Sequence, residues 1–346
     1  MTHAQTTDSA LSPAPLMELA GAFWGFKTFA AAVELNLFSL LADGRRMSLK
    51  EIAAELGIHE RPADMFLAGC ASLGLLDKEG DAYGNTPISE EFLVVGRPRY
   101  FGGFVRYCDQ REYPAWHRVI DAMRTNAPLT WDPRTQDSVF AAEDPVMLEL
   151  FWEAMFSLSA YTAAKLADVV DFHQHRRLLD VGGGSAAFPI GLSKYYPHLT
   201  ATVFDLPHVR PIAEEKISKA GRSEAISFVA GDFVADPELP RGHDVILLSS
   251  ILHDWDEHTG RQLLSKCYEA LEPGGQIVIC ELLLNPERTG PASAALMGLN
   301  MVVETAGGKN YAEDEYLSWL AEAGFTDGRV IHFEAAGANG AVIARK

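Results

Sequence analysis

The sequence predicts an α/β fold for the second half of the chain, preceded by a mainly α-helical N-terminal region. Beyond residue 170, short apolar runs alternate with segments of helical pattern, which is typical of parallel strands joined by crossover helices. Before residue 170, apolar residues mostly recur at helical spacing instead. The expected strands lie near residues 177–181, 200–204, 226–229, 244–249, 276–282 and 340–345.

The composition excludes several classes of function. The chain has 346 residues and a formal net charge of −18, which opposes binding to a nucleic acid backbone or an anionic membrane. It shows neither a basic and apolar leader nor an apolar run of spanning length, so we expect a cytoplasmic protein. The four cysteines are far apart and form no CxxC motif, which predicts no metal site and no disulfide framework. A small-molecule ligand fits these properties best.

The N-terminal region combines an apolar helical segment with a winged-helix pattern. Residues 16–42 are apolar almost all round, so we expect one or two helices covered by a partner subunit. Ser48 can cap a short helix that Gly57 ends, and a second helix begins at residues 60–62. Residues 74–86 then read as a two-stranded wing.

A winged helix often binds DNA, but the charge of this one argues against that function. Residues 43–91 hold five basic side chains against ten acidic ones, so the predicted recognition helix would repel phosphate. A metabolite-binding regulator is nevertheless an alternative from a different class. Sequence-specific DNA binding at physiological salt would support that alternative.

A glycine-rich loop follows the first predicted strand of the α/β region. In "LLDVGGGSAAF", Gly182 and Gly184 lie between strand and helix, where a ligand can approach the backbone closely. This spacing alone also satisfies the dinucleotide fingerprint. Asp180 ends the strand, and its negative charge repels a pyrophosphate but suits an ammonium or a sulfonium.

Two further carboxylates follow the next two strands. Asp205 ends the second strand about twenty residues beyond the loop, where it can bind ribose hydroxyls. Asp232 follows the third strand and is placed to bind an adenine amino group, with Phe233 beside it as an apolar wall. Together these residues predict a site for a positively charged adenosine derivative.

These motifs resemble a known family. "DVGGGSAAFPIGLSKYYPHLTATVFDLPHV", "GDF", "LHDWDE", "ALEPGGQIVICE" and "GGKNYAEDEYLSWLAEAGF" are similar to the S-adenosylmethionine-dependent small-molecule O-methyltransferases of the plant caffeate and bacterial polyketide type. The resemblance covers essentially the whole chain. It implies a homodimer, S-adenosyl-L-methionine as cofactor, and a Rossmann-like class I methyltransferase domain behind a winged-helix dimerisation domain. The expected boundaries are 1–105 for the dimerisation domain, 106–170 for a helical connector contributing to the substrate pocket, and 171–346 for the catalytic domain.

His253, in "LHDWDE", is the predicted general base. A phenol has a pKa near 10 and is a poor nucleophile until it loses its proton, which a neutral imidazole can accept. The resemblance assigns the same role to this histidine and places an orienting glutamate at Glu281. It places a second glutamate at position 310, where this chain has Asn310 in "GGKNY". This departure removes a charge and leaves the usual orienting arrangement, and O-selectivity, open.

The resemblance also indicates further contacts. Asp254 is ambiguous, because it can bind cofactor, orient the turn or cap the following helix. The additional residues expected at the cofactor are Leu206, Ser249, Trp255 and Ser159, the last at the methionine carboxylate. The residues expected to line the acceptor pocket are Met147, Phe151 and Met155 on one helical face, and Trp116, Asn300, Met301 and Glu304.

The predicted function is methylation of a hydroxyl on a small aromatic secondary metabolite. C- or N-methylation on the same scaffold is the nearest alternative, and Asn310 favours it. A nicotinamide oxidoreductase is a third alternative, because Tyr161 and Lys165 form a YxxxK motif. That motif precedes the glycine loop, whereas in short-chain dehydrogenases it follows the loop.

Overall fold

A computed structural model describes residues 11–136 and 145–346. The chain divides into two compact units, Met1–Asp109 and Gln110–Lys346. The separate connector expected over residues 106–170 stays a prediction. Within the described residues, no helix has the length and apolar character needed to cross a membrane.

The first unit is a helical domain with a small antiparallel sheet. Its strands pair in the order β1-β3-β2, so that β2 and β3 form the predicted wing. Its elements are α1 (Ala14–Glu34), α2 (Leu37–Leu40), β1 (Met47–Ser48), α3 (Leu49–Leu56), α4 (Glu60–Ser72), β2 (Leu76–Glu79), β3 (Ala82–Asn85), α5 (Pro87–Phe92) and α6 (Gly102–Tyr107). A π-helix, η1 (Cys108–Glu112), follows at the boundary of the units.

Local sequence determines the ends of α3 as predicted. The Ser48 side chain accepts the Glu51 N–H and the Glu51 carboxylate accepts the Ser48 N–H, which completes a capping box. Gly57 ends the helix at φ +66°, a conformation that glycine adopts without strain. Helix α1 carries large exposed apolar side chains, among them Leu16, Leu19 and Trp24. This is the surface for which the sequence predicts a partner.

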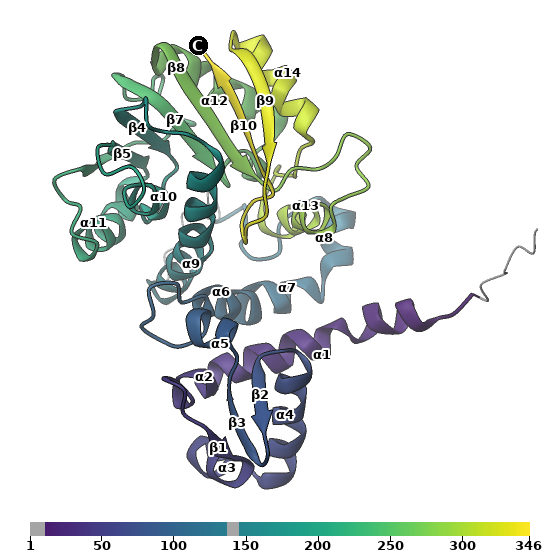
Figure 1. Ribbon diagram of the computed structural model, residues 1–346. Helices are drawn as coiled ribbons and strands as arrows, with labels where there is room; N and C mark the ends of the chain where they lie inside the picture. Colours follow the sequence, from purple (N-terminus) through teal and green to yellow (C-terminus); the bar gives the residue numbers. More distant parts are fainter. Residues whose placement is uncertain (1–10, 137–144) are drawn as a thin grey trace, which may run out of the picture. The chain divides into compact units, whose positions relative to one another are not determined.

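The second unit is built on a seven-stranded sheet with the strand order β6-β5-β4-β7-β8-β10-β9 (Figure 1). Its strands are β4 (Arg177–Val181), β5 (Thr200–Asp205), β6 (Ile226–Ala230), β7 (His243–Ser249), β8 (Leu271–Glu281), β9 (Thr326–His332) and β10 (Gly340–Arg345). Its helices are α7 (Tyr113–Trp116), α8 (Val119–Thr125), α9 (Pro145–Val169), α10 (Ala187–Leu192), α11 (Arg210–Lys219), α12 (Glu257–Ala270), α13 (Ala292–Glu304) and α14 (Glu313–Ala323), with short 3₁₀ turns η3 (Pro207–Val209) and η4 (Leu252–Asp254).

The α/β fold class is confirmed, and the sheet differs from the prediction at one edge. Strands β4 to β8 pair in parallel, but β10 runs antiparallel to both β8 and β9. The expectation of a parallel strand at 340–345 is therefore wrong, and β9 was missed. The physical reason is that only residues 333–339 separate β9 from β10, which is enough for a hairpin but not for a parallel crossover.

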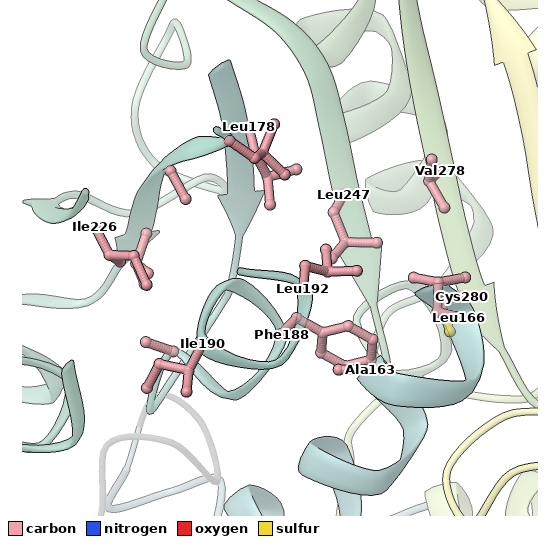
Figure 2. Packing of buried hydrophobic residues seen from close by; sticks show 14 of the residues in the cluster. Ala163, Leu166, Leu178, Phe188, Ile190, Leu192, Ile226, Leu247, Val278 and Cys280 are labelled. Atoms are coloured by element: carbon pink, nitrogen blue, oxygen red, sulfur yellow. The ribbon is translucent and has the colours of Figure 1, made fainter. Parts of the chain in front are cut away.

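Alternate strand residues face two helical layers. One apolar cluster joins Leu178, Leu247 and Val278 to side chains of α9, α10 and α11, part of which Figure 2 shows. The other joins Leu179, Ile246 and further strand residues to α12 and α14. Burial on both faces explains why these strands read as continuous apolar runs.

Candidate active site

The site lies where the direction of strand addition reverses. The chain builds β4, β5 and β6 toward one edge and then crosses to β7 on the other side of β4. In open α/β sheets, ligands bind beyond the carboxyl ends of the strands at this switch point. The glycine loop follows β4 and His253 follows β7, so the sheet topology brings together the two main predicted motifs.

The glycine loop forms a cradle that side chains would fill. Gly182 and Gly184 have φ angles of +69° and +54°. A Cβ on residue 182 would lie 2.4 Å from Cδ1 of Ile251, and one on residue 184 would lie 2.6 Å from Cζ3 of Trp152. The Gly184 N–H donates to Oδ2 of Asp205 at 2.7 Å, which ties the loop to the end of β5. Glycine is therefore required at both positions.

Asp180 is a buried carboxylate suited to a cationic ligand. It is 2 % exposed, and its Oδ2 has no hydrogen-bond partner among the described residues. Burial, aided by the negative charge of Asp205, raises the pKa of Asp180 to about 8. A positive charge beside the loop would lower the cost of ionising it. This orphaned oxygen fits an ammonium or sulfonium ligand.

The turn after β6 places an aromatic wall beside the loop. Oδ1 of Asp232 accepts the Val234 N–H at 2.8 Å, so one carboxylate oxygen shapes the turn. The rings of Phe233 and Trp255 meet edge to face with centroids 5.6 Å apart. A Cβ on Gly182 would lie 3.5 Å from the Phe233 ring, which places this pair next to the glycine loop.

Lys266 is a residue that the sequence analysis missed. From α12, its ammonium donates to the backbone carbonyl oxygens of Phe233, Val234 and Asp236 at 2.8, 3.2 and 2.6 Å. It therefore holds the turn that carries the aromatic wall. Nothing in the amphipathic pattern of its helix distinguishes this lysine from one that faces solvent.

Glu281 is hydrogen-bonded to His253. Oε2 of Glu281 lies 2.6 Å from Nδ1 of His253, while Oε1 accepts the N–H groups of Ile251 and Leu252 at 3.0 and 3.1 Å. The glutamate is fully buried at the end of β8, so these contacts compensate for its desolvation. With Nδ1 bound to the carboxylate, Nε2 is the nitrogen left for an acceptor.

The carboxylates also set the charge of the imidazole. Burial lowers the pKa of His253, but Glu281 and Asp254 outweigh burial and raise it to about 9. Burial raises the pKa of Asp254 to about 6 although His253 opposes this shift. Asp254 does not cap the next helix, because the cap of α12 is Asp256.

Asn310 is buried, and its amide nitrogen is hydrogen-bonded to the backbone. It is 2 % exposed, and its Nδ2 donates to the Leu282 carbonyl oxygen at 2.6 Å. Within residues 11–136 and 145–346 it makes no hydrogen bond to His253. Its role in catalysis stays a prediction.

The polar residues expected to line the acceptor pocket are engaged within the second unit. Asn300 accepts from Nε1 of Trp116 at 2.7 Å and donates to Oε1 of Glu112 at 2.9 Å. Glu304, which is 5 % exposed, accepts from the Thr130 hydroxyl at 3.0 Å. These bonds hold the segment before α9 against α13.

The other predicted contacts stay predictions. Leu206 donates its N–H to Oδ1 of Asp205 at 2.6 Å, and Ser249 is partly buried at the end of β7. Met301 is buried on α13. Partly buried positions on α9 are Phe151, Met155 and Ser159, whereas the side chain of Met147 lies outside the described residues. In the part of the chain that is described, no cluster of three metal-ligating side chains occurs.

Comparison with known proteins shows the family of this chain. The O-methyltransferase domain family matches residues 116–326, and the O-methyltransferase dimerisation domain matches residues 17–95. The chain belongs to the O-methyltransferase family. It is an S-adenosylmethionine-dependent O-methyltransferase, as the resemblance implied.

Individual relatives cover almost the whole methyltransferase. It is 44 % identical to a 3-hydroxy-5-methyl-1-naphthoate 3-O-methyltransferase of Streptomyces sahachiroi, over 95 % of this chain and 94 % of the relative. It is 34 % identical to TcmO of Streptomyces glaucescens, a tetracenomycin polyketide synthesis 8-O-methyl transferase, over 92 % of each chain. The crystal structure of human N-acetylserotonin methyltransferase with S-adenosylmethionine matches with a TM-score of 0.85 and 29 % identity, covering 99 % of both chains.

Proposed function

We propose that this methyltransferase methylates a ring hydroxyl of a small aromatic acid of the naphthoate type, with His253 as general base. The arrangement of His253 and Glu281 carries the proposal, because it fixes Nδ1 and leaves Nε2 to accept a proton. The naphthoate acceptor is inferred from the Streptomyces relative. We further propose that the protein forms a homodimer through the first unit. It would act in the cytoplasm and would not bind nucleic acid.

The residues of the site divide the work between binding and proton transfer. Bound S-adenosylmethionine supplies an electrophilic methyl group on a positively charged sulfur, which keeps the C–S electron pair after transfer. Asp180 would balance its positive charge, Asp205 would bind the ribose, and Asp232 with Phe233 and Trp255 would hold the adenine. Nε2 of His253 takes the acceptor's hydroxyl proton, and the oxygen keeps the electron pair that bonds to the methyl carbon.

The test combines labelled S-adenosylmethionine with hydroxynaphthoates and other phenols, followed by mass spectrometry to locate the label. We expect the label on oxygen; label on carbon or nitrogen would support the alternative reaction. His253→Ala should lower turnover by about 10² or more while cofactor affinity changes little. His258→Ala is the matched control, because this exposed histidine on α12 hydrogen-bonds Gln262 of its own helix. If His253→Ala left turnover unchanged, His253 would not be the general base.

A further inference from the structure

Asp254 is the ionisable residue of the site whose role the sequence left open. Capping is excluded, because Oδ1 of Asp256 accepts the Thr259 N–H at 2.8 Å and begins α12. The side chain of Asp254 is only 14 % exposed. No N–H or O–H group of the described residues donates a hydrogen bond to its carboxylate. A carboxylate that is largely shielded from water and has no hydrogen-bond donors is costly to ionise unless a positive charge faces it.

The charge that faces Asp254 is the imidazole of His253. Oδ1 of Asp254 lies 3.5 Å from Nε2, and Oε2 of Glu281 lies 2.6 Å from Nδ1. The ring therefore has one carboxylate near each nitrogen. Tyr316 on α14 also interacts with Glu281 and Asp254, and burial raises its pKa well above 10, so it stays neutral.

The two carboxylates differ in what else they do. Glu281 also accepts two backbone N–H groups, so part of its charge stabilises the start of η4. Among the described residues, Asp254 accepts no backbone N–H group. It lies near Nε2 of His253, the atom that would receive the acceptor's proton. At position 310, the neutral amide is bonded to Leu282 and supplies no second negative charge.

We propose that Asp254 is a positioning residue for proton transfer, acting as the second carboxylate that stabilises the His253 imidazolium. This inference rests on the proposed function. When the acceptor's O–H bond breaks, the proton moves to Nε2 and the oxygen keeps the electron pair for its bond to the methyl carbon. The new positive charge then lies between Glu281 and Asp254. The same attraction raises the pKa of His253 to about 9, so the neutral ring that acts as base becomes more abundant as the pH rises toward that value.

The pH dependence of kcat/KM for the acceptor tests the proposal, because its acid limb reports the base in the free enzyme. Asp254→Asn keeps the shape of the side chain and removes its charge. We expect the acid limb to move down by about one pH unit or more, since the pair is close and partly shielded from water. The maximal kcat should fall about tenfold, while the dissociation constant for S-adenosylmethionine changes less than about twofold.

Asp256→Asn is the matched control. It removes the same charge two residues away and keeps the cap, because asparagine caps helices as well as aspartate does. Its acid limb should coincide with that of the wild type. An acid limb of Asp254→Asn that also coincides with the wild type would overturn the proposal.

Two arms keep the result decisive. Where Asp254→Asn is too unstable to purify, the His253 ring protons of Asp254→Ser are titrated by NMR, and an unchanged midpoint overturns the proposal. The His253→Ala variant separates the two hypotheses. If His253→Ala is inactive and the acid limb of Asp254→Asn does not shift, only the proposed role of Asp254 is wrong. If His253→Ala is active, the proposed function of His253 as general base is wrong.

Discussion

Replacing Glu281 with glutamine tests how the site fixes the proton of its base. The carboxylate oxygens accept three N–H groups: two from the backbone of Ile251 and Leu252, and one from Nδ1 of His253. A glutamine has one oxygen and one NH₂ group in the same space. Its oxygen can accept the two backbone donors only if the NH₂ group faces Nδ1.

The structure indicates which orientation prevails. The opposite orientation would set an NH₂ donor against two buried backbone donors, each left unsatisfied at about 1–3 kcal/mol. The amide oxygen should therefore face the backbone, and Nδ1 must then accept a hydrogen bond. The proton of the neutral ring moves to Nε2, the atom proposed to take the acceptor's proton. A wrong tautomer of this kind lowers turnover about 10⁴-fold.

The assay measures label transfer at saturating cofactor and acceptor, with calorimetry for cofactor binding and urea unfolding for stability. We expect Glu281→Gln to lose turnover, to bind S-adenosylmethionine within a few-fold of wild type, and to unfold cooperatively. The control is Glu287→Gln, which makes the same substitution at an exposed residue. Gln276 is buried and therefore offers no suitable control position. Turnover of Glu281→Gln within tenfold of the wild type would refute the tautomer argument.

Three further predictions concern the cofactor. Asp205→Ala should weaken binding by about tenfold or more, since it removes a charge-assisted bond worth about 1.5–3 kcal/mol; equal calorimetric affinity would contradict the ribose contact. Lys266→Met should raise the cofactor KM about three- to tenfold and leave kcat unchanged, because it removes three hydrogen bonds to the turn after β6, which is proposed to hold the adenine; a fall in kcat alone would oppose this role. Cofactor affinity should fall as pH drops from 9 to 7, because Asp180, with a pKa of about 8, becomes neutral and cannot balance a cation. In Asp180→Asn, the cofactor affinity measured by calorimetry should depend less on pH. A pH dependence equal to that of the wild type would show that Asp180 does not contribute to cofactor binding.

Local patterns account for what could be predicted. The capping box at Ser48, the left-handed Gly57 and the strand before Gly182 depend on residues close in sequence, and all three have the predicted form. The hairpin edge of the sheet was not predictable in the same way. Residues 326–332 are largely exposed, so their apolar pattern is weak, and the direction of 340–345 depends on that partner.

The candidate site shows the same division. The types and positions of its carboxylates and of His253 are visible in the chain, because each follows a recognisable strand. Which atoms meet is not visible. The register that pairs Ser249 with Cys280 brings Glu281 beside the turn of His253, and a shift by one residue would turn that carboxylate to the other face of the sheet.

By itself, the sequence determined the α/β class, the glycine loop and the chemical groups of the site, because these follow from local conformation and side-chain chemistry. The tertiary structure alone decided that Glu281 lies at Nδ1 of His253, that Asp254 faces Nε2 while Asp256 caps the helix, and that Lys266 holds the turn after β6. The physical reason is that these contacts join residues on different elements or on a single tight turn. Their directions are set by strand register and packing, which no local pattern encodes.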